Sequence, residues 1–203
     1  MTKPLYAYAL MLCLVAACSS SAHQARPADA QQTPKGNNVN PDAGLVADFK
    51  KRVDDYVKLR EKGASAAPVE LQEKSKAADI VTAEKSMAQK VREARHGAKP
   101  GDIFTPATQA MFKRLLRPPL TKGAEGADNK ATIKDDAPAP REVPFKVNAE
   151  YPKHAPLSTV PPDVLLTLPA LPEDIQYRFA GKHLLLLDVK ANLIIDYMLN
   201  AIP

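Results

Sequence analysis

The chain has 203 residues, with 28 Lys and Arg against 23 Asp and Glu, a formal net charge of +5. Its 19 prolines, absence of Trp and 5% aromatic residues argue against one dense core along the whole length. The sequence has no phosphate-binding glycine loop, HExxH pair, CxxC pair or nucleophile elbow. Nothing in it therefore points to the nucleotide-binding, zinc-protease, dithiol or serine-hydrolase classes that these motifs mark.

The N-terminus has the pattern of an export signal. Lys3 is followed by an uncharged apolar run of 13 residues, Leu5 to Ala17. A membrane-spanning helix needs about 20 apolar residues, so this run fits the core of a signal peptide better. The run ends in Val15-Ala16-Ala17-Cys18, which resembles the lipobox of bacterial lipoproteins. The resemblance implies that residues 1–17 are removed and that the Cys18 thiol carries a diacylglycerol.

The residues around Cys18 refine this expectation. Ser19, in place of Asp, favours the outer membrane over the inner one, with the protein facing the periplasm. Ser20-Ser21-Ala22 also suits ordinary signal cleavage, and that alternative gives a soluble periplasmic or secreted protein. Cys13 lies in the discarded segment, so no thiol is left in the mature lipoprotein for a disulfide or a metal site.

Composition divides the remaining chain into four parts. Residues 18–43 are polar and are predicted to be a disordered tether. Residues 44–117 have helical periodicity, residues 118–142 read as a proline-containing linker, and residues 143–203 contain strand-like runs. The predicted fold class is α+β, with a small helical region and an antiparallel module of three or four strands.

Three helices are expected in the first region. The first has the apolar stripe Leu45, Phe49, Val53 and Tyr56, with Gly63 as its predicted end. The second runs from about Val69 to Arg95, and its thin stripe is Ala77, Ile80, Glu84, Met87, Val91 and Ala94. The third begins with Thr105 as the N-cap and Pro106 at the first helical position, and Pro118-Pro119 is expected to stop it.

The C-terminal runs 175–180, 184–189 and 193–198 predict a β-meander. A tight turn at residues 190–192 would pair Val189 with Leu193. Placing Ile175, Tyr177 and Phe179 on the same face as Leu185 and Leu187 then requires a three-residue loop, Gly181-Lys182-His183, because a two-residue turn inverts every side chain. A short strand at 143–147 and a helical turn after Pro161-Pro162 are also expected.

The pattern of the last strands, Tyr177-Arg178-Phe179, Leu184 to Asp188 and Leu193 to Asp196, resembles the C-terminal β-hairpin of RcnB-type periplasmic proteins. The resemblance covers about twenty-five residues and implies a similar C-terminal β-hairpin and a periplasmic location. Those proteins are linked to nickel and cobalt homeostasis, but this chain lacks their His-rich or Cys-rich ligands. Its four histidines are widely separated, so neither a metal site nor a cofactor is predicted.

The most notable polar set is Arg178, Asp188 and Asp196. In the predicted register all three project from one face of the sheet, with Arg178 diagonal to Asp188. Two carboxylates beside an arginine can perform acid–base chemistry in a cleft. The plainer interpretation, which we favour, is a salt-bridged face that positions a covering element.

Charge bears on possible partners. Residues 45–117 contain 16 Lys and Arg against 10 Asp and Glu, an excess that suits an anionic surface. Nucleic acid is not expected, because no aromatic residues interleave with the basic ones. The sequence thus predicts an exported lipoprotein acting as a non-enzymatic binding or structural module for an envelope protein or anionic surface. The alternative is a small periplasmic hydrolase or metal-dependent enzyme that uses Arg178, Asp188 and Asp196.

Overall fold

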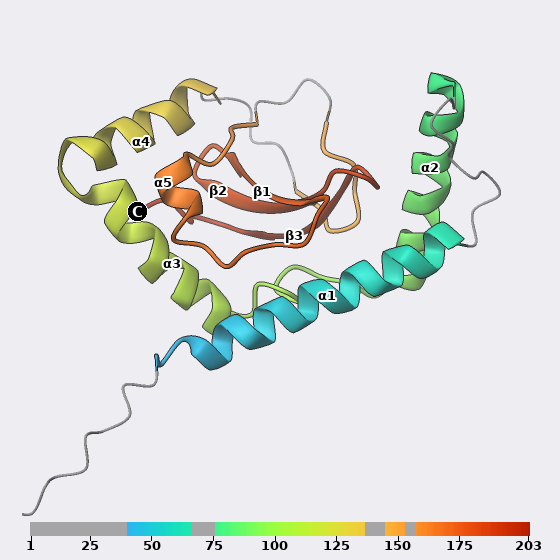
Figure 1. Ribbon diagram of the computed structural model, residues 1–203, viewed down its shortest axis with the longest axis horizontal. Coiled ribbons are helices and arrows are strands. Elements are labelled where there is room, and N and C mark those ends of the chain that lie inside the picture. Colours follow the sequence, from blue (N-terminus) through green and yellow to red (C-terminus); the bar gives the residue numbers. More distant parts are fainter. Residues whose placement is uncertain (1–39, 66–75, 137–144, 153–156) are drawn as a thin grey trace, which may run out of the picture. The chain divides into compact units, whose positions relative to one another are not determined.

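The computed structural model describes residues 40–65, 76–136, 145–152 and 157–203, and Val39–Pro203 cluster as one compact unit. The predicted signal, Cys18 and nearly all of the predicted tether lie outside the described residues. The predicted α+β class is confirmed (Figure 1). The described elements are α1 (Ala43–Ser65), α2 (Ala77–Ala94), α3 (Pro106–Thr121), α4 (Gly123–Asp136), α5 (Pro162–Leu165), β1 (Ile175–Ala180), β2 (His183–Asp188) and β3 (Leu193–Met198).

Helix α1 buries three of the four residues of the predicted stripe, since Phe49, Val53 and Tyr56 are each at most 4% exposed, and Leu45 is partly buried against the same core. The prediction that Gly63 ends the helix is wrong, because α1 continues to Ser65. A Cβ atom at Gly63 would lie 3.1 Å from the Cβ of Lys90 on α2. Glycine at this position therefore allows a close approach of two helices rather than a helix end.

Helix α2 is only partly buried. Met87 and Val91 of the predicted stripe are buried, whereas Ile80 is 40% exposed and Ala94 is exposed. The predicted start near Val69 lies outside the described residues. Packing against the rest of the protein thus holds the C-terminal half of α2, while its N-terminal half leaves apolar side chains at the surface.

Helix α3 begins as predicted but ends later. The Thr105 side chain accepts a hydrogen bond from the Thr108 N–H at 3.3 Å, and Pro106 occupies the first turn. The predicted stop at Pro118-Pro119 is wrong, because the helix runs to Thr121. Proline lacks the N–H of the helical ladder and usually breaks a helix. Here burial of the following residue, Leu120, to 1% exposure favours one more turn.

Most of the predicted linker is helical, because residues 123–136 form α4. Ile133, the isolated apolar residue of this segment, is 1% exposed and belongs to the main hydrophobic core, so its burial stabilises the packing of α4 against the rest of the protein. Asn129 Nδ2 donates to the Pro119 carbonyl at 2.9 Å, which fixes α4 against the end of α3. Residues 137–144 lie outside the described residues.

The first hairpin differs from its predicted register. Ala180 pairs with His183, so the loop is the two-residue turn Gly181-Lys182, with Gly181 at φ +56°. The expected three-residue loop is therefore wrong. Glycine in the left-handed region suits the first position of such a turn. The pattern of apolar residues does not determine this register, because Leu184, Leu185 and Leu186 are all fully buried. Leu184 and Leu186 lie on one face of the sheet and Leu185 on the other.

The second hairpin also differs. Asp188, rather than Val189, pairs with Leu193, and Val189 is 44% exposed. Between Leu186 and Leu187 the register shifts, because Leu187 pairs with Ile194 and Leu186 with Asp196. Ile195 is thus the extra residue of a β-bulge, which changes the face on which the following residues lie.

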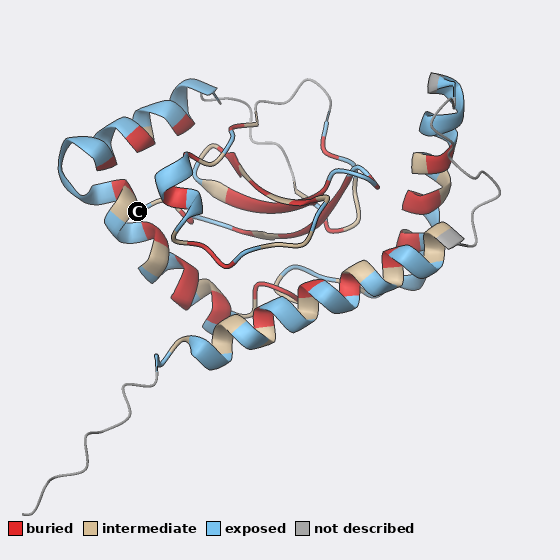
Figure 2. Ribbon diagram, viewed as in Figure 1, coloured by how far each residue is buried: buried red, intermediate tan, exposed pale blue. Residues whose placement is uncertain are grey.

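Both faces of the antiparallel sheet, ordered β1-β2-β3, are covered. The helix-facing core combines residues of all four long helices with one face of the sheet, and Figure 2 shows this burial. The other face has a smaller cluster: Tyr151, Ala180, Leu185, Leu187 and Ile194, with Phe145, Leu157 and Tyr197 packed on it. Residues 145–147 of the predicted fourth strand are not a strand, whereas the helical turn after Pro161 is present. No described helix is long and apolar enough to cross a membrane.

Candidate functional site

The Asp188 carboxylate lies at the end of β2 and is 1% exposed. Its Oδ2 accepts a hydrogen bond from the hydroxyl of Tyr56 on α1 at 2.7 Å. Its Oδ1 accepts from Arg60 at 3.3 Å and from the N–H groups of Lys190 and Ala191 at 2.9 and 2.8 Å. The carboxylate therefore joins α1 to the turn after β2 through four donors.

Two arginines surround this contact. The side chain of Arg60 is 6% exposed and also lies 3.6 Å from Asp174 Oδ2. The Arg95 guanidinium lies 5.0 Å from the centre of the Tyr56 ring and donates to the Ile195 carbonyl and to Asn148 Oδ1. Burial, followed by the negative charge of Asp188, raises the pKa of the Tyr56 hydroxyl well above its usual value. Tyr56 therefore stays protonated and remains a donor at neutral pH.

Asp196 on β3 is fully buried and also has four donors. Its Oδ1 accepts from the N–H groups of Gly101 and Tyr197 at 3.0 and 2.8 Å. Its Oδ2 accepts from the N–H groups of Ile103 and Phe104, both at 2.8 Å. Because three of these donors belong to the loop between α2 and α3, Asp196 fixes the backbone conformation of that loop. Gly101, at φ +91°, allows the loop to turn its N–H inward.

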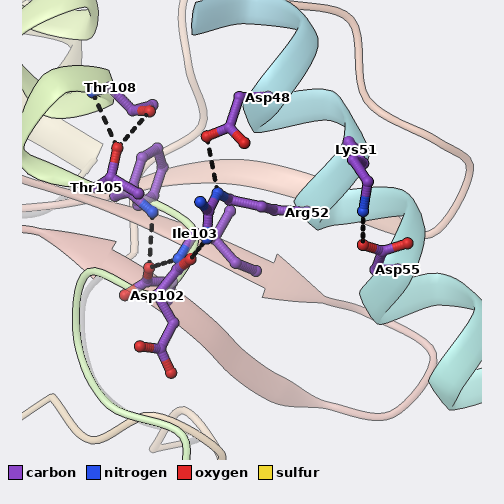
Figure 3. A network of polar contacts seen from close by, with 10 residues as sticks. Asp48, Lys51, Arg52, Asp55, Asp102, Ile103, Thr105 and Thr108 are labelled. Carbon is purple, nitrogen blue, oxygen red and sulfur yellow. Dashed lines mark hydrogen bonds and ion pairs between the residues drawn. The ribbon is translucent and has the colours of Figure 1, made fainter.

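Helix α1 holds the same loop from outside (Figure 3). Arg52 donates from Nε to Asp48 Oδ2 at 2.8 Å and from a terminal nitrogen to the Asp102 carbonyl at 2.9 Å. Thr105, at the end of the loop, caps α3 through Thr108. The loop is thus fixed on one side by a buried carboxylate and on the other by a half-buried arginine.

The structure brings only part of the predicted polar set together. Asp188 and Asp196 share the helix-facing side of the sheet, because their cross-strand partners Leu193 and Leu186 both belong to that core. Arg178 pairs with Leu185 and therefore lies on the other face. The expectation that all three project from one face is wrong, and the cause is the one-residue difference in the first hairpin. Arg178 instead donates to Gln176 Oε1 at 2.6 Å.

These contacts define what the carboxylates can do. An ionised carboxylate has about four lone-pair positions, and each of the two receives four hydrogen bonds. Both oxygens of Asp196 accept two hydrogen bonds each, so its positions are filled. At Asp188, Oδ1 accepts three hydrogen bonds and Oδ2 accepts the one from Tyr56, but the residue is 1% exposed, so a substrate or metal ion would reach it only if a structural contact broke. Within the described ranges, every fully buried side-chain N or O atom has a hydrogen-bond partner. The same residues contain no group of three or more His, Cys, Asp or Glu side chains that could hold a metal ion.

One open groove, of about 620 Å³, lies between α1 and α2. Leu59, Gly63 and Ala94 form its apolar part, and its charged residues are Asp55, Lys58, Lys62, Lys90 and Glu93. Lys90 lies 3.5 Å from Glu93, so part of the positive charge is already paired. The groove is separate from the buried carboxylates.

The sequence pointed to the two carboxylates but not to their partners. Tyr56 was expected only as a member of an apolar stripe, and Arg60 and the 101–104 backbone carried no motif. One signal was available: Asp196 follows Leu193-Ile194-Ile195, and an aspartate within a buried apolar run requires several donors. The sequence does not say where these donors come from, since Ile103 lies 93 residues away.

Fold and site together define an α+β protein in which two buried aspartates, each with four hydrogen-bond donors, join helices and the loop between α2 and α3 to a three-stranded sheet. A scan against protein-family models and searches of characterised proteins and of solved structures give no match to this chain.

Proposed function

We propose that this protein is exported to the bacterial cell envelope, is lipid-anchored through Cys18, and acts there as a non-enzymatic binding module. The observation that carries the non-enzymatic part is that Asp188 and Asp196 are both buried and that each holds four hydrogen bonds within the protein. Acid–base chemistry needs a carboxylate that reaches the substrate and exchanges a proton with it. Each of these carboxylates is instead buried and occupied by four donors from the protein itself.

The envelope address comes from the sequence. The 13-residue apolar run from Leu5 to Ala17, followed by Cys18, fits a lipoprotein signal. A single acyl chain binds a membrane only marginally, so stable anchoring needs the several chains that a lipoprotein cysteine carries. The folded unit from Val39 onward would then be held at the membrane through residues 18–38.

The alternative, a hydrolase using Arg178, Asp188 and Asp196, has less support. Arg178 lies on the opposite face of the sheet from both carboxylates, so it cannot assist them across the intact sheet. In addition, opening either carboxylate to a substrate would release donors from α1 or from the 101–104 loop.

The proposed location and lipid anchoring are tested by labelled-palmitate incorporation and membrane fractionation of the full-length protein beside Cys18→Ser. We expect the wild-type protein to be labelled and membrane-bound, and the variant to be unlabelled. If neither is labelled and the wild-type chain is found free in the periplasm, lipid anchoring is wrong and ordinary signal cleavage is the better interpretation.

The non-enzymatic part is tested by assaying the purified protein on ester, phosphate and glycosidic substrates beside Arg178→Gln. Arg178 is half-exposed, so this variant should fold normally, as circular dichroism can verify. We expect no turnover by either protein. Turnover by the wild-type protein that is lost in a folded Arg178→Gln variant would establish the hydrolase alternative.

A further inference from the structure

Helix α3 has a one-sided distribution of charge. Residues 106–122 contain Lys113, Arg114, Arg117 and Lys122 and no acidic residue. The buried side of α3 is formed by Thr108, Met111, Phe112, Leu116 and Leu120. Lys113, Arg114 and Arg117 are all exposed, and their spacing puts them on one face, opposite the core. We call these three residues the basic face of α3.

The basic face lies beside the start of the described chain. The Arg114 guanidinium forms an ion pair with the Asp42 carboxylate, while its side chain stays 56% exposed. Asp42 immediately precedes α1, and Cys18 lies only 24 positions before it in the sequence. The chain that leads to the proposed anchor therefore leaves the folded unit next to the basic face.

We infer that the basic face of α3 rests on the anionic phospholipid surface of the membrane that holds the anchor. This inference depends on the lipid anchoring proposed above. Lysine and arginine can extend their charged ends to phosphate groups while their aliphatic stems stay near the helix. Each basic residue close to an anionic surface strengthens binding about fivefold, and salt weakens the attraction. The basic face would therefore orient the folded unit that the acyl chains hold at the membrane.

Two other surfaces fit this role less well. The groove between α1 and α2 contains three lysines, but Asp55 and Glu93 in the same groove offset most of their charge. The exposed Ile80 and Val81 on α2 form an apolar patch, and nothing in the structure shows what covers it. The basic face combines an excess of positive charge, because Asp42 offsets only Arg114, with a position at the proposed tether.

The test measures co-sedimentation with lipid vesicles of residues 18–203 carrying Cys18→Ser, so that no acyl chain contributes. One set of vesicles is pure phosphatidylcholine and the other contains added phosphatidylglycerol. We expect binding only to the anionic vesicles, with a steep decrease as salt rises. The triple variant Lys113→Gln, Arg114→Gln, Arg117→Gln should lower the partition coefficient about a hundredfold, at about fivefold per charge.

The matched control is Lys58→Gln, Lys62→Gln, Lys90→Gln, which removes the same charge from three exposed groove residues. We expect its partition coefficient to stay within about fivefold of the wild type, since only general attraction is reduced. Equal losses in both triple variants, or equal binding to both kinds of vesicle, would overturn the inference. If palmitate labelling succeeds and vesicle binding fails, only this inference is lost; if labelling fails, the proposed anchor and this inference are both lost.

Discussion

Tyr56 on α1 donates a 2.7 Å hydrogen bond to Asp188, which lies 132 residues further along the chain. Both residues are buried, at 4% and 1% exposure. The contact connects the first long helix to the sheet, and it uses an ionised acceptor in a water-poor environment. Hydrogen bonds to charged groups contribute more stability than neutral ones, about 1.5–3 kcal/mol against about 1 kcal/mol.

Tyr56→Phe should therefore lower the free energy of unfolding by about 2 kcal/mol, measured by urea denaturation. Tyr177→Phe is the matched control, because the Tyr177 hydroxyl is also buried but donates to the neutral Pro169 carbonyl at 3.0 Å. We expect the control to lose about 1 kcal/mol. An equal loss in the two variants would mean that the charge of Asp188 adds nothing to the contact with Tyr56.

Asp196→Asn should be more severe. An amide has one acceptor oxygen, and its NH₂ group would face backbone N–H groups that need an acceptor. We expect a loss of about 3 kcal/mol or more, and faster hydrogen exchange at the amides of Gly101, Ile103 and Phe104. Asp102→Asn in the same loop is the control, because the Asp102 side chain accepts from the exposed Lys99 N–H and the Arg52 contact goes to the Asp102 backbone carbonyl. Unchanged hydrogen exchange at these three amides in Asp196→Asn would contradict the conclusion that Asp196 fixes the conformation of the loop.

Gly126 should not tolerate a side chain. A Cβ atom there would lie 2.8 Å from the Thr121 nitrogen and 3.0 Å from the Leu120 carbonyl carbon, and these backbone atoms cannot move aside cheaply. We expect Gly126→Ala to destabilise the protein by about 1–3 kcal/mol, as overpacking does. Gly44→Ala in α1 meets nothing within 4 Å and should stabilise by about 0.5–1 kcal/mol. Denaturation midpoints that shift in the same direction would disprove the close α3–α4 approach.

Stability should fall in alkaline solution. Burial raises the pKa of both Tyr56 and Tyr177 in the folded protein, whereas a tyrosine in the unfolded chain titrates near pH 10. Above about pH 10 the unfolded chain loses protons that the folded protein keeps, so the free energy of unfolding decreases as pH rises, by up to about 1.4 kcal/mol per pH unit for each tyrosine. Denaturation at a series of pH values should show a shallower slope in Tyr177→Phe; an unchanged slope would mean that this hydroxyl titrates normally.

The sequence predicted elements whose signals are local. The N-cap Thr105, the first-turn Pro106 and the stripe of α1 all depend on residues close in the chain, and each is confirmed. The predictions failed where packing against residues distant in the sequence determines the structure. Pro118-Pro119 did not end α3 because burial of Leu120 outweighs the missing ladder bonds.

The candidate site shows the same division. Asp188 and Asp196 could be selected because acidic residues next to apolar runs are unusual, but their donors come from α1 and the 101–104 loop. Arg178 was placed wrongly because both faces of the sheet are buried, so an apolar pattern alone does not choose between a two-residue and a three-residue turn.

The long separations between the two aspartates and their donors also constrain the order of folding. Tyr56 and the 101–104 loop are synthesised before Asp188 and Asp196, which lie 132 and 92–95 residues later. A nascent chain that ends before β2 has the helices but neither of the carboxylates that fix them. Contacts between distant residues also slow folding, because a long loop must close first. The N-terminal helices should therefore remain loosely packed until the last strands are complete, so the nascent chain would not reach its final fold before its synthesis ends.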